Sequence, residues 1–298
     1  MGECVIYNPA AGRGRAKNLI AELTRRYPGR FDLRPTTAPG HGTDLALNAI
    51  ADGCTTVIAA GGDGTVHEVA AGILQANEPA VVFGVWPVGS ANDYAYALGI
   101  QSDWPLDDAR RQAMSVRAVD VGRVTGGGRS MFFVNCLGIG FNSAVTLSAR
   151  RIPWLTGMAL YGLAFLHCVC RHFVSPTYAV TLDNTTADWP TLAFTLGLGK
   201  REGGFLVTPQ ASLDDGLFDY VHAGGLTRWK ALTMLPKIAT GTLPADHPLI
   251  RVGRCREATV RAAGPLRVHV DGEFFCLDDD DIHEVRVEVL PRRLRVLA

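Results

Sequence analysis

A glycine-rich segment restricts the fold of this chain more than any other feature. The residues GGDGT, at 61–65, follow the apolar run TVIAA at 56–60 and precede apolar residues at helical spacing from Val66 to Leu74. This order predicts a buried strand, a tight turn and a helix. Glycines let the backbone approach a ligand closely, and a helix N-terminus offers unpaired N–H groups to an anion. The segment therefore predicts a phosphate-binding turn rather than a turn without a ligand. The carboxylate of Asp63 suggests a divalent cation beside the phosphate.

Two other glycine-containing turns follow predicted strands. NPAAGRGR, at 8–15, comes after a strand at 4–8, and PVGSANDY, at 87–94, comes after a strand at 81–87. The carboxyl ends of parallel strands lie at one edge of a sheet, so the three turns are expected to meet where open α/β sheets bind ligands. Asn8 and the nearby arginines can contact phosphate. The Gly-Lys-Ser/Thr of a Walker A loop is missing from the sequence, which disfavours ordinary P-loop enzymes.

The pattern of apolar residues predicts two domains of different class. A chain of 298 residues is long enough for about two domains. Strands and helices alternate over residues 1–118, which predicts an α/β domain with a parallel sheet. Residues 119–298 contain short alternating or aromatic strands between turns and are expected to be mainly antiparallel β, with the last strand free to return to the first domain. Gly126-Gly127-Gly128 is interpreted as a hairpin loop, and Thr43 or Asp44 as the N-cap of a helix ending near Gly53.

Charge and cysteine content exclude some classes of function. Basic and acidic residues number 29 each, so a generally basic nucleic-acid-binding protein is not expected and no nucleic-acid partner is predicted. The seven cysteines are scattered, without Cys-x-x-Cys spacing, which favours reduced thiols over a zinc or redox site. The N-terminus lacks the features of a signal peptide, and a cytoplasmic location is expected.

One stretch in the second half is unusually apolar. Residues 152–170 contain no Asp, Glu, Lys or Arg, and basic residues lie on both sides. Three interpretations remain open: a buried helix, a helix lying at a membrane surface, and a membrane-spanning helix. The stretch is marginal in length for a span, and Pro153 and two glycines weaken that interpretation.

The ordered set NPAAGRGRA, GGDGTVHEV and PVGSANDYAYALGI resembles the diacylglycerol kinase catalytic fold. This group includes bacterial diacylglycerol kinases, YegS-like lipid kinases, and eukaryotic sphingosine and ceramide kinases. The resemblance continues through VDVGRV, GIGFNSAV, TPQASLDDGLFDY and VDGEFF, and so covers nearly the whole chain. GGDGT alone is shared with NAD kinases and phosphofructokinases, whereas the ordered set is far more specific. The resemblance implies an NAD-kinase-like α/β domain followed by an antiparallel β-sandwich that receives the lipid.

The resemblance also implies particular site residues. Glu273 corresponds to the catalytic base of the family, assisted by Asp63, although Asp-Gly before Glu273 is also a strong hairpin signal. A Mg²⁺ site is implied at the Asp215 carboxylate with the backbone carbonyls of Ser212 and Leu217. Glu68 has an alternative role as a first-turn glutamate favoured by the helix dipole. The residues expected to bind ATP are Asn8, Thr36, Gly62, Asp63, Gly64, Thr65, Val66, His67, Glu68 and Ser90, the last standing where many relatives carry Thr.

These features together predict an ATP- and Mg²⁺-dependent lipid kinase. The expected reaction phosphorylates a hydroxyl of a membrane-derived lipid, with diacylglycerol, which would give phosphatidic acid, as the first candidate. Peripheral contact with the inner face of the membrane is expected, and the alternating strand from Arg286 to Val296 could pair with a second copy in a homodimer if its edge is exposed. Two alternatives remain: a soluble-substrate kinase resembling NAD kinase, and a catalytically silent lipid or nucleotide sensor.

Overall fold

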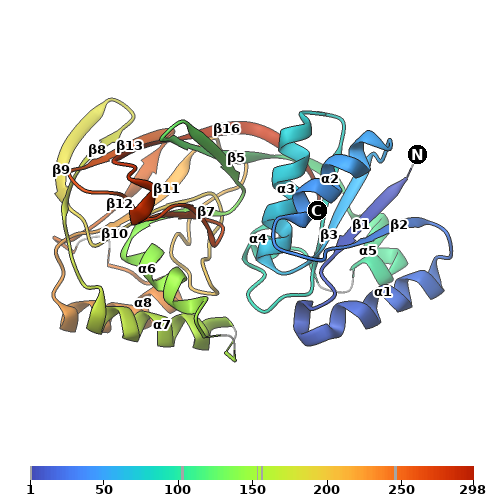
Figure 1. Cartoon of the computed structure of the whole chain (residues 1–298), viewed down its shortest axis with the longest axis horizontal. Coiled ribbons are helices and arrows are strands. Elements are labelled where there is room, and N and C mark those ends of the chain that lie inside the picture. The colour runs from blue at the N-terminus through green and yellow to red at the C-terminus, as the bar shows by residue number, and fades with distance from the viewer. Residues whose placement is uncertain (1, 102–103, 153, 156, 245–246) are drawn as a thin grey trace. The chain divides into compact units, whose positions relative to one another are not determined.

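The computed structural model describes residues 2–101, 104–152, 154–155, 157–244 and 247–298. The chain divides into two compact units (Figure 1). The first unit contains residues 1–121 and 291–298, and the second contains residues 122–290.

The first unit is built on a parallel sheet. Its strands run in the order β2-β1-β3-β4, and the C-terminal end of β16 pairs in parallel with β4. Val5, Ile6, Val57 and Ile58 are almost fully buried, as expected when helices cover both faces of a sheet. The strands are β1 (Glu3–Tyr7), β2 (Phe31–Pro35), β3 (Thr56–Gly61), β4 (Val82–Pro87) and the end of β16 (Glu284–Leu297).

Helices cover both faces of this sheet. In Figure 1, α2 and α3 lie on one side of the strands and α1 on the other. Ala16, Ile20 and Leu23 of α1 pack against Val5 and Ile58, so this helix turns an apolar face toward the sheet. The helices are α1 (Arg15–Arg26), α2 (His41–Ala51), α3 (Asp63–Ala76), α4 (Asp93–Leu98) and α5 (Asp108–Ala113).

Two details of the first unit differ from the sequence prediction. Helix α2 begins at His41 with Gly40 as its N-cap, so neither Thr43 nor Asp44 caps it. Gly40 takes a left-handed conformation, with φ of 83°, that ends the preceding turn earlier than a Thr or Asp cap would. Strand β2 was not predicted, because its residues FDLRP are mostly half-exposed and polar, as is common at the edge of a sheet.

The second unit contains two mainly antiparallel sheets. One has the order β16-β13-β8-β9, with the β5–β6 hairpin joined to β16, and the other has the order β12-β11-β10-β7-β14-β15. Gly126 pairs with Arg129, so the predicted glycine hairpin between β5 and β6 is confirmed. The strands are β5 (Val116–Gly126), β6 (Arg129–Phe133), β7 (Cys136–Gly140), β8 (Thr177–Leu182), β9 (Thr185–Pro190), β10 (Ala193–Gly197), β11 (Phe218–Ala223), β12 (Ile250–Cys255), β13 (Glu257–Ala262), β14 (Val268–Val270), β15 (Glu273–Cys276) and β16.

Three helices cover one face of the second sheet. They are α6 (Phe141–Ala149), α7 (Gly157–Arg171) and α8 (Arg228–Thr240), and they lie together in Figure 1. Phe141 of α6 stacks edge-on against Phe165 of α7, with ring centroids 5.3 Å apart. Ala164 and Cys168 are fully buried in the same cluster. One side of the apolar stretch is therefore part of the core of this unit.

The predicted fold class is confirmed: an α/β unit with a parallel sheet is followed by an antiparallel β-sandwich. The last strand returns to the first unit, where Arg295–Leu297 pair with β4. In the second unit Glu284–Glu288 of the same strand pair with β13, so at both ends the strand already has a partner within the chain. Within the described residues, no helix combines the length and apolar character needed to cross a bilayer. Pro153 and Thr156, in the apolar stretch, lie outside the described residues.

Candidate active site

The three glycine-containing turns of the first unit meet at one corner of its sheet. A Cβ atom on Gly89 would lie 2.4 Å from the Cα atom of Gly62, and one on Gly12 would lie 2.6 Å from the carbonyl oxygen of Val88. Contacts this short leave no room for a side chain, so glycine is required for the backbones to approach each other. The predicted convergence of the three turns is therefore confirmed.

Main-chain hydrogen bonds join these turns. The Asn8 N–H donates to the carbonyl oxygen of Ala60 at 3.1 Å, and the Val88 N–H donates to that of Gly61 at 2.8 Å. The first residues of α3 follow directly, and the leading N–H groups of a helix have no acceptor within the helix. This corner can therefore offer main-chain donors to an anionic ligand.

Asp63 connects two of the turns. Its carboxylate accepts hydrogen bonds from the backbone N–H groups of Asn92, at 2.9 Å, and Asp93, at 2.6 Å, at the start of α4. Burial raises the pKa of the Asp63 carboxyl, and the bonds from these N–H groups oppose that rise. Asp63 thus connects the turn after β4 to the start of α3.

The other residues predicted for ATP binding differ in exposure. The Glu68 carboxylate accepts hydrogen bonds from the N–H groups of Gly40 and Gly42, both at 2.8 Å, at the start of α2. Val66 and His67 are at least nine-tenths buried, so their side chains face the interior of the unit. Ser90 is exposed and Thr36 is half-exposed. The hydroxyls of Ser90 and Thr36 are therefore more accessible to a ligand than the side chains of Val66 and His67.

Glu273 follows a rigid hairpin of the second unit. Asp271 and Gly272, at φ of 51° and 88°, form the turn between β14 and β15. The Asp271 carboxylate accepts bonds from three successive backbone N–H groups, of Val134, Asn135 and Cys136, at 2.9–3.0 Å. The Asp-Gly pair is thus a turn, as its sequence suggested, and it sets the position of Glu273.

Arg150 contacts Glu273 directly. A guanidinium nitrogen of Arg150 lies 2.7 Å from a carboxylate oxygen of Glu273 and donates to the carbonyl oxygen of Gly272 at 2.6 Å. The guanidinium also lies over the ring of Phe274, 4.8 Å from its centroid. Both charged side chains are nearly half-exposed, so this pair is accessible to a substrate.

The predicted metal-binding loop lies beside strands β11 and β12. Asp215 accepts a bond from the Leu217 N–H at 3.1 Å, and Ser212 donates from its hydroxyl to Asp214 at 2.8 Å. One carboxylate oxygen of Asp219 is buried without a hydrogen-bond partner in the described part of the chain. Burial raises the pKa of Asp219, which a cation would oppose. An oxygen-only donor set with one unpaired buried oxygen fits Mg²⁺.

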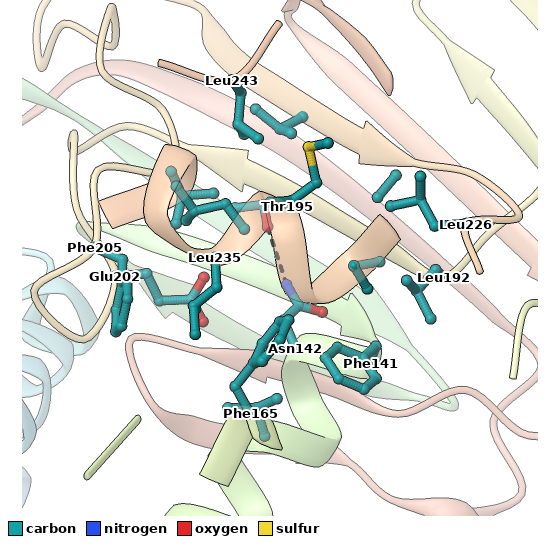
Figure 2. Close-up of a pocket in the computed structure, with 18 of the residues that line it drawn as sticks. Phe141, Asn142, Phe165, Leu192, Thr195, Glu202, Phe205, Leu226, Leu235 and Leu243 are labelled. Carbon is teal, nitrogen blue, oxygen red and sulfur yellow. Dashed lines mark hydrogen bonds between the residues drawn. The ribbon is translucent and has the colours of Figure 1, made fainter. Parts of the chain in front are cut away.

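An apolar cavity of about 150 Å³ lies within the second unit, between α6, α7, α8 and the second sheet (Figure 2). Phe141, Phe165 and Tyr161 contribute aromatic walls, and Met234 and Leu235 of α8 contribute aliphatic ones. Phe165 and Tyr161 belong to the charge-free stretch that the sequence singled out. This part of α7 thus faces a cavity as well as the core.

Sequence reasoning did not identify Arg150, Asn142 or Glu202. Asn142 and Glu202 are polar side chains in the wall of the cavity. The signal for Glu202 was available, because Glu-Gly-Gly-Phe at 202–205 has the form of a two-residue hairpin. Its position against α6 and α7 depends on long-range packing, which the local sequence does not encode.

Comparison with known families agrees with both units. Residues 3–124 match the diacylglycerol kinase catalytic domain, and residues 135–298 match the YegS C-terminal NAD kinase beta sandwich-like domain. The second match alone covers more than half of the chain. The chain belongs to the diacylglycerol kinase family. It is therefore a lipid kinase by family, as its ordered motifs predicted.

Individual relatives support the same assignment. The diacylglycerol kinase of Bacillus subtilis (strain 168) is 28% identical over 285 residues, which cover 91% of this chain and 89% of the relative. The diacylglycerol kinase of Mycobacterium tuberculosis (strain ATCC 25618 / H37Rv) is 31% identical over 280 residues, covering 90% and 87%. A solved structure of a diacylglycerol kinase from Bacillus anthracis str. Sterne has a TM-score of 0.73 at 18% identity and covers 99% of this chain and 96% of its own. At that identity the likeness shows a shared fold.

Proposed function

We propose that this chain transfers the γ-phosphate of ATP to a hydroxyl of a membrane-derived lipid. Diacylglycerol, which would give phosphatidic acid, is the first acceptor to test, because the relatives described above carry the name diacylglycerol kinase. The observation that carries the proposal is the contact of the Gly62 and Gly89 backbones at the N-terminus of α3. Such a corner suits the phosphates of a nucleotide, since backbone N–H groups can approach them without side chains in between.

Glu273 is proposed as the base that activates the acceptor. The lipid hydroxyl gives its proton to the Glu273 carboxylate as its oxygen bonds to the γ-phosphorus, while the bond from that phosphorus to the β-phosphate oxygen breaks. The products are ADP and the phosphorylated lipid. Exposure of Glu273 supports this role, because the carboxylate can be reached from solvent.

Mg²⁺ is proposed at two places. Bound with the triphosphate, it would neutralise negative charge during transfer. Asp215, with the carbonyls of Ser212 and Leu217, would hold a second ion, and the unpaired oxygen of Asp219 supports a cation at this loop. Arg254, 3.5 Å from Asp219, already supplies part of the positive charge there. This second ion would stabilise the loop after β10.

An apolar surface on α7 and α8 is proposed to contact the membrane. Met158, Leu163 and Leu166 of α7 are 39–48% exposed, and Trp229 at the start of α8 is 80% exposed. Tryptophan and basic side chains are favoured at membrane interfaces, and exposed basic residues adjoin both helices: Arg150, Arg151, Arg171, Arg228 and Lys230.

An assay with several acceptors tests the proposed reaction. Labelled ATP is offered with diacylglycerol and with sphingosine in separate mixed vesicles, and with NAD in a parallel sample. We expect a labelled lipid and no labelled dinucleotide. A labelled dinucleotide alone would favour a kinase of soluble substrates, and binding of ATP without any phosphorylated lipid would favour a sensor. Either result would overturn the proposal.

A vesicle-sedimentation assay tests the membrane contact. Met158→Asp combined with Leu166→Asp should reduce binding to anionic vesicles while leaving phosphorylation of a short-chain soluble acceptor nearly unchanged. Val252→Asp, at a valine of the same unit that is 42% exposed on β12, is the matched control. Leu160 and Phe165 are unsuitable for this test, because both pack against the core of the unit. Equal loss in the double variant and the control would contradict the contact.

A further inference from the structure

We propose that Glu202 makes this kinase selective for single-chain lipids that carry a second hydrogen-bond donor, a hydroxyl or an amine, beside the acceptor hydroxyl. The inference rests on the proposed lipid phosphorylation and specifies the acceptor class. Glu202 would accept a hydrogen bond from that second donor while the apolar chain occupies the cavity between α6, α7 and α8.

The position of Glu202 is unusual for a carboxylate. Nearly all residues around the cavity are apolar, and Glu202 is the one acidic side chain among the described residues that line it. Figure 2 shows Glu202 and Leu235 in the wall of the cavity, together with the Asn142–Thr195 pair. The side chain is 17% exposed, so it is largely desolvated but still accessible. A carboxylate in such a place needs donors, because burial of an unpaired charge is costly.

Two features hold Glu202 in place. Its backbone pairs with Phe205 across a tight turn in which Gly203 and Gly204 have φ of 61° and 88°. A Cβ on Gly203 would lie 2.7 Å from the ring of Tyr161, so the turn packs directly against α7. The carboxylate oxygen Oε1 then lies 2.6 Å from Nε2 of His269. The backbone turn and this bond fix the orientation of the carboxylate before a ligand arrives.

The polar atoms near the cavity accept hydrogen bonds more than they donate them. An ionised carboxylate is an acceptor only, and one bond from His269 leaves further lone pairs on Glu202. Asn142 donates from Nδ2 to the Thr195 hydroxyl at 3.0 Å, while its Oδ1 has no partner within the described residues. The ester carbonyls of diacylglycerol are themselves acceptors and would not pair with these atoms. A free hydroxyl or an ammonium group would.

The size of the cavity favours one chain over two. At about 150 Å³ it matches cavities that hold a single benzene-sized molecule. It therefore takes a segment of one acyl or alkyl chain, with further length able to follow the apolar faces of Phe165 and Met234. A second chain would have to remain outside.

Glu202 connects the cavity to the hairpin that carries Glu273. His269, the partner of Glu202, pairs with Phe274 across β14 and β15, and their rings lie 6.5 Å apart. Glu273 is the neighbour of Phe274 in the chain. Arg150, which contacts the Glu273 carboxylate, also lies over the Phe274 ring, so both residues share a neighbour at this hairpin. In the proposal, the acceptor hydroxyl of a lipid whose second donor reaches Glu202 extends toward this hairpin.

A hydrolytic role for the same residues is disfavoured. Ser143, His269 and Glu202 form a Ser-His-Glu series, with Ser143 Oγ 3.0 Å from Nδ1 of His269. Ser143 is only 1% exposed, and its hydroxyl also lies within hydrogen-bond distance of the carbonyl oxygens of Gly138 and Arg267. A nucleophile must reach its substrate, and this hydroxyl cannot. The series instead supports the position of Glu202.

The test compares two acceptors in the same enzyme sample. Phosphorylation of a monoacylglycerol and of a diacylglycerol with identical acyl chains is measured with the wild type and with Glu202→Leu. For each enzyme, kcat/KM for the monoacylglycerol is divided by kcat/KM for the diacylglycerol. We expect this ratio to fall at least tenfold in Glu202→Leu. Because a folding defect would lower both activities together, the ratio reports selectivity rather than stability. An unchanged ratio would overturn the proposal.

Two further variants sharpen the result. Glu202→Gln should retain the preference for monoacylglycerol, since its amide oxygen still accepts from a hydroxyl. For a long-chain amino alcohol, its kcat/KM relative to that for diacylglycerol should fall at least tenfold, because the charge that attracts the ammonium group is gone. Glu288→Gln is the matched control, because Glu288 belongs to the same unit and pairs with Arg123 outside the cavity. It should change neither the monoacylglycerol-to-diacylglycerol ratio nor the amino-alcohol-to-diacylglycerol ratio. If the proposed lipid phosphorylation itself is wrong, the wild type will phosphorylate none of these lipids, a result distinct from an unchanged ratio.

Discussion

In the first unit the candidate site is made of main chain. Gly12, Gly62 and Gly89 bring three turns together, and the bonds that join the turns are mostly between backbone groups. In the second unit the site is made of side chains from distant segments, such as Glu202, Asn142 and Glu273. Backbone sites tolerate little change in shape, whereas side-chain sites can change their ligand by single substitutions. The proposed function accordingly assigns the phosphate donor to the first unit and the acceptor to the second.

The prediction with the largest expected effect concerns Glu273, the proposed base in the second unit. Glu273→Gln removes the proposed proton acceptor, and we expect kcat to fall by roughly 10²–10⁴. Binding of ATP, measured by calorimetry, should stay unchanged, because Glu273 belongs to the other unit. Glu288→Gln serves as the control. If Glu273→Gln keeps the wild-type kcat, the second unit does not supply the base through Glu273.

A second prediction concerns the pH dependence of the second unit. His222 is fully buried on β11, and burial lowers its pKa to about 4. The imidazole is therefore neutral in the folded chain but takes up a proton near pH 6.5 when unfolded. Its contribution to stability is complete above pH 6.5 and is lost as the pH falls towards 4. The loss amounts to about 3 kcal/mol at 1.36 kcal/mol per pKa unit.

Hydrogen exchange measured at pH 7 and pH 5 checks this effect. Protection of β10 and β11 should decrease at the lower pH, and His222→Phe should reduce the decrease. The ring of Trp189, 4.6 Å from that of His222, offers a local fluorescence signal. If β1 and β3 lost protection in parallel and His222→Phe changed nothing, the titration would not originate at this histidine.

A third prediction tests the backbone character of the first unit. Gly89→Ala places a methyl group 2.4 Å from the Cα of Gly62, so the turns must separate. We expect a loss of about 1–3 kcal/mol in stability together with weaker ATP binding. Gly64→Ala is the matched change, because no atom lies within 4 Å of a Cβ there. It should leave the melting temperature nearly unchanged, because a methyl group at this position meets no neighbouring atom. Equal melting temperatures for both variants would contradict the packing argument.

The smallest expected effect concerns Arg150. Arg150→Met removes the bonds to Glu273 and to the Gly272 carbonyl, and we expect a roughly tenfold lower kcat because the carboxylate loses its fixed orientation. Arg150→Lys should recover part of the activity, and the KM for ATP should not change in either variant. A rise in kcat on loss of Arg150 would mean that the arginine blocks Glu273 rather than orienting it.

Much of the fold could be predicted from local patterns. Apolar periodicity and flanking glycines predict helices α1 and α3 and strands β1, β3 and β4. Each of these elements buries apolar residues that are close together in the sequence, so the local pattern is sufficient. Strand β2, the N-cap of α2 and the helices α6 and α8 were not predicted. Helix α8 contains Pro236, and β2 is half-exposed, so the local signal for each was weak.

The sequence by itself determined the three turns and the family to which they belong, because a glycine that permits close backbone contact is needed wherever the motif occurs. Only the tertiary structure decided that Arg150 contacts Glu273 and that Glu202, fixed by His269, lies in the wall of an apolar cavity. These pairs are separated by 123 and 67 residues in the chain. Side chains so far apart in the chain come into contact only when the sheets and helices pack, so no local sequence pattern predicts these contacts.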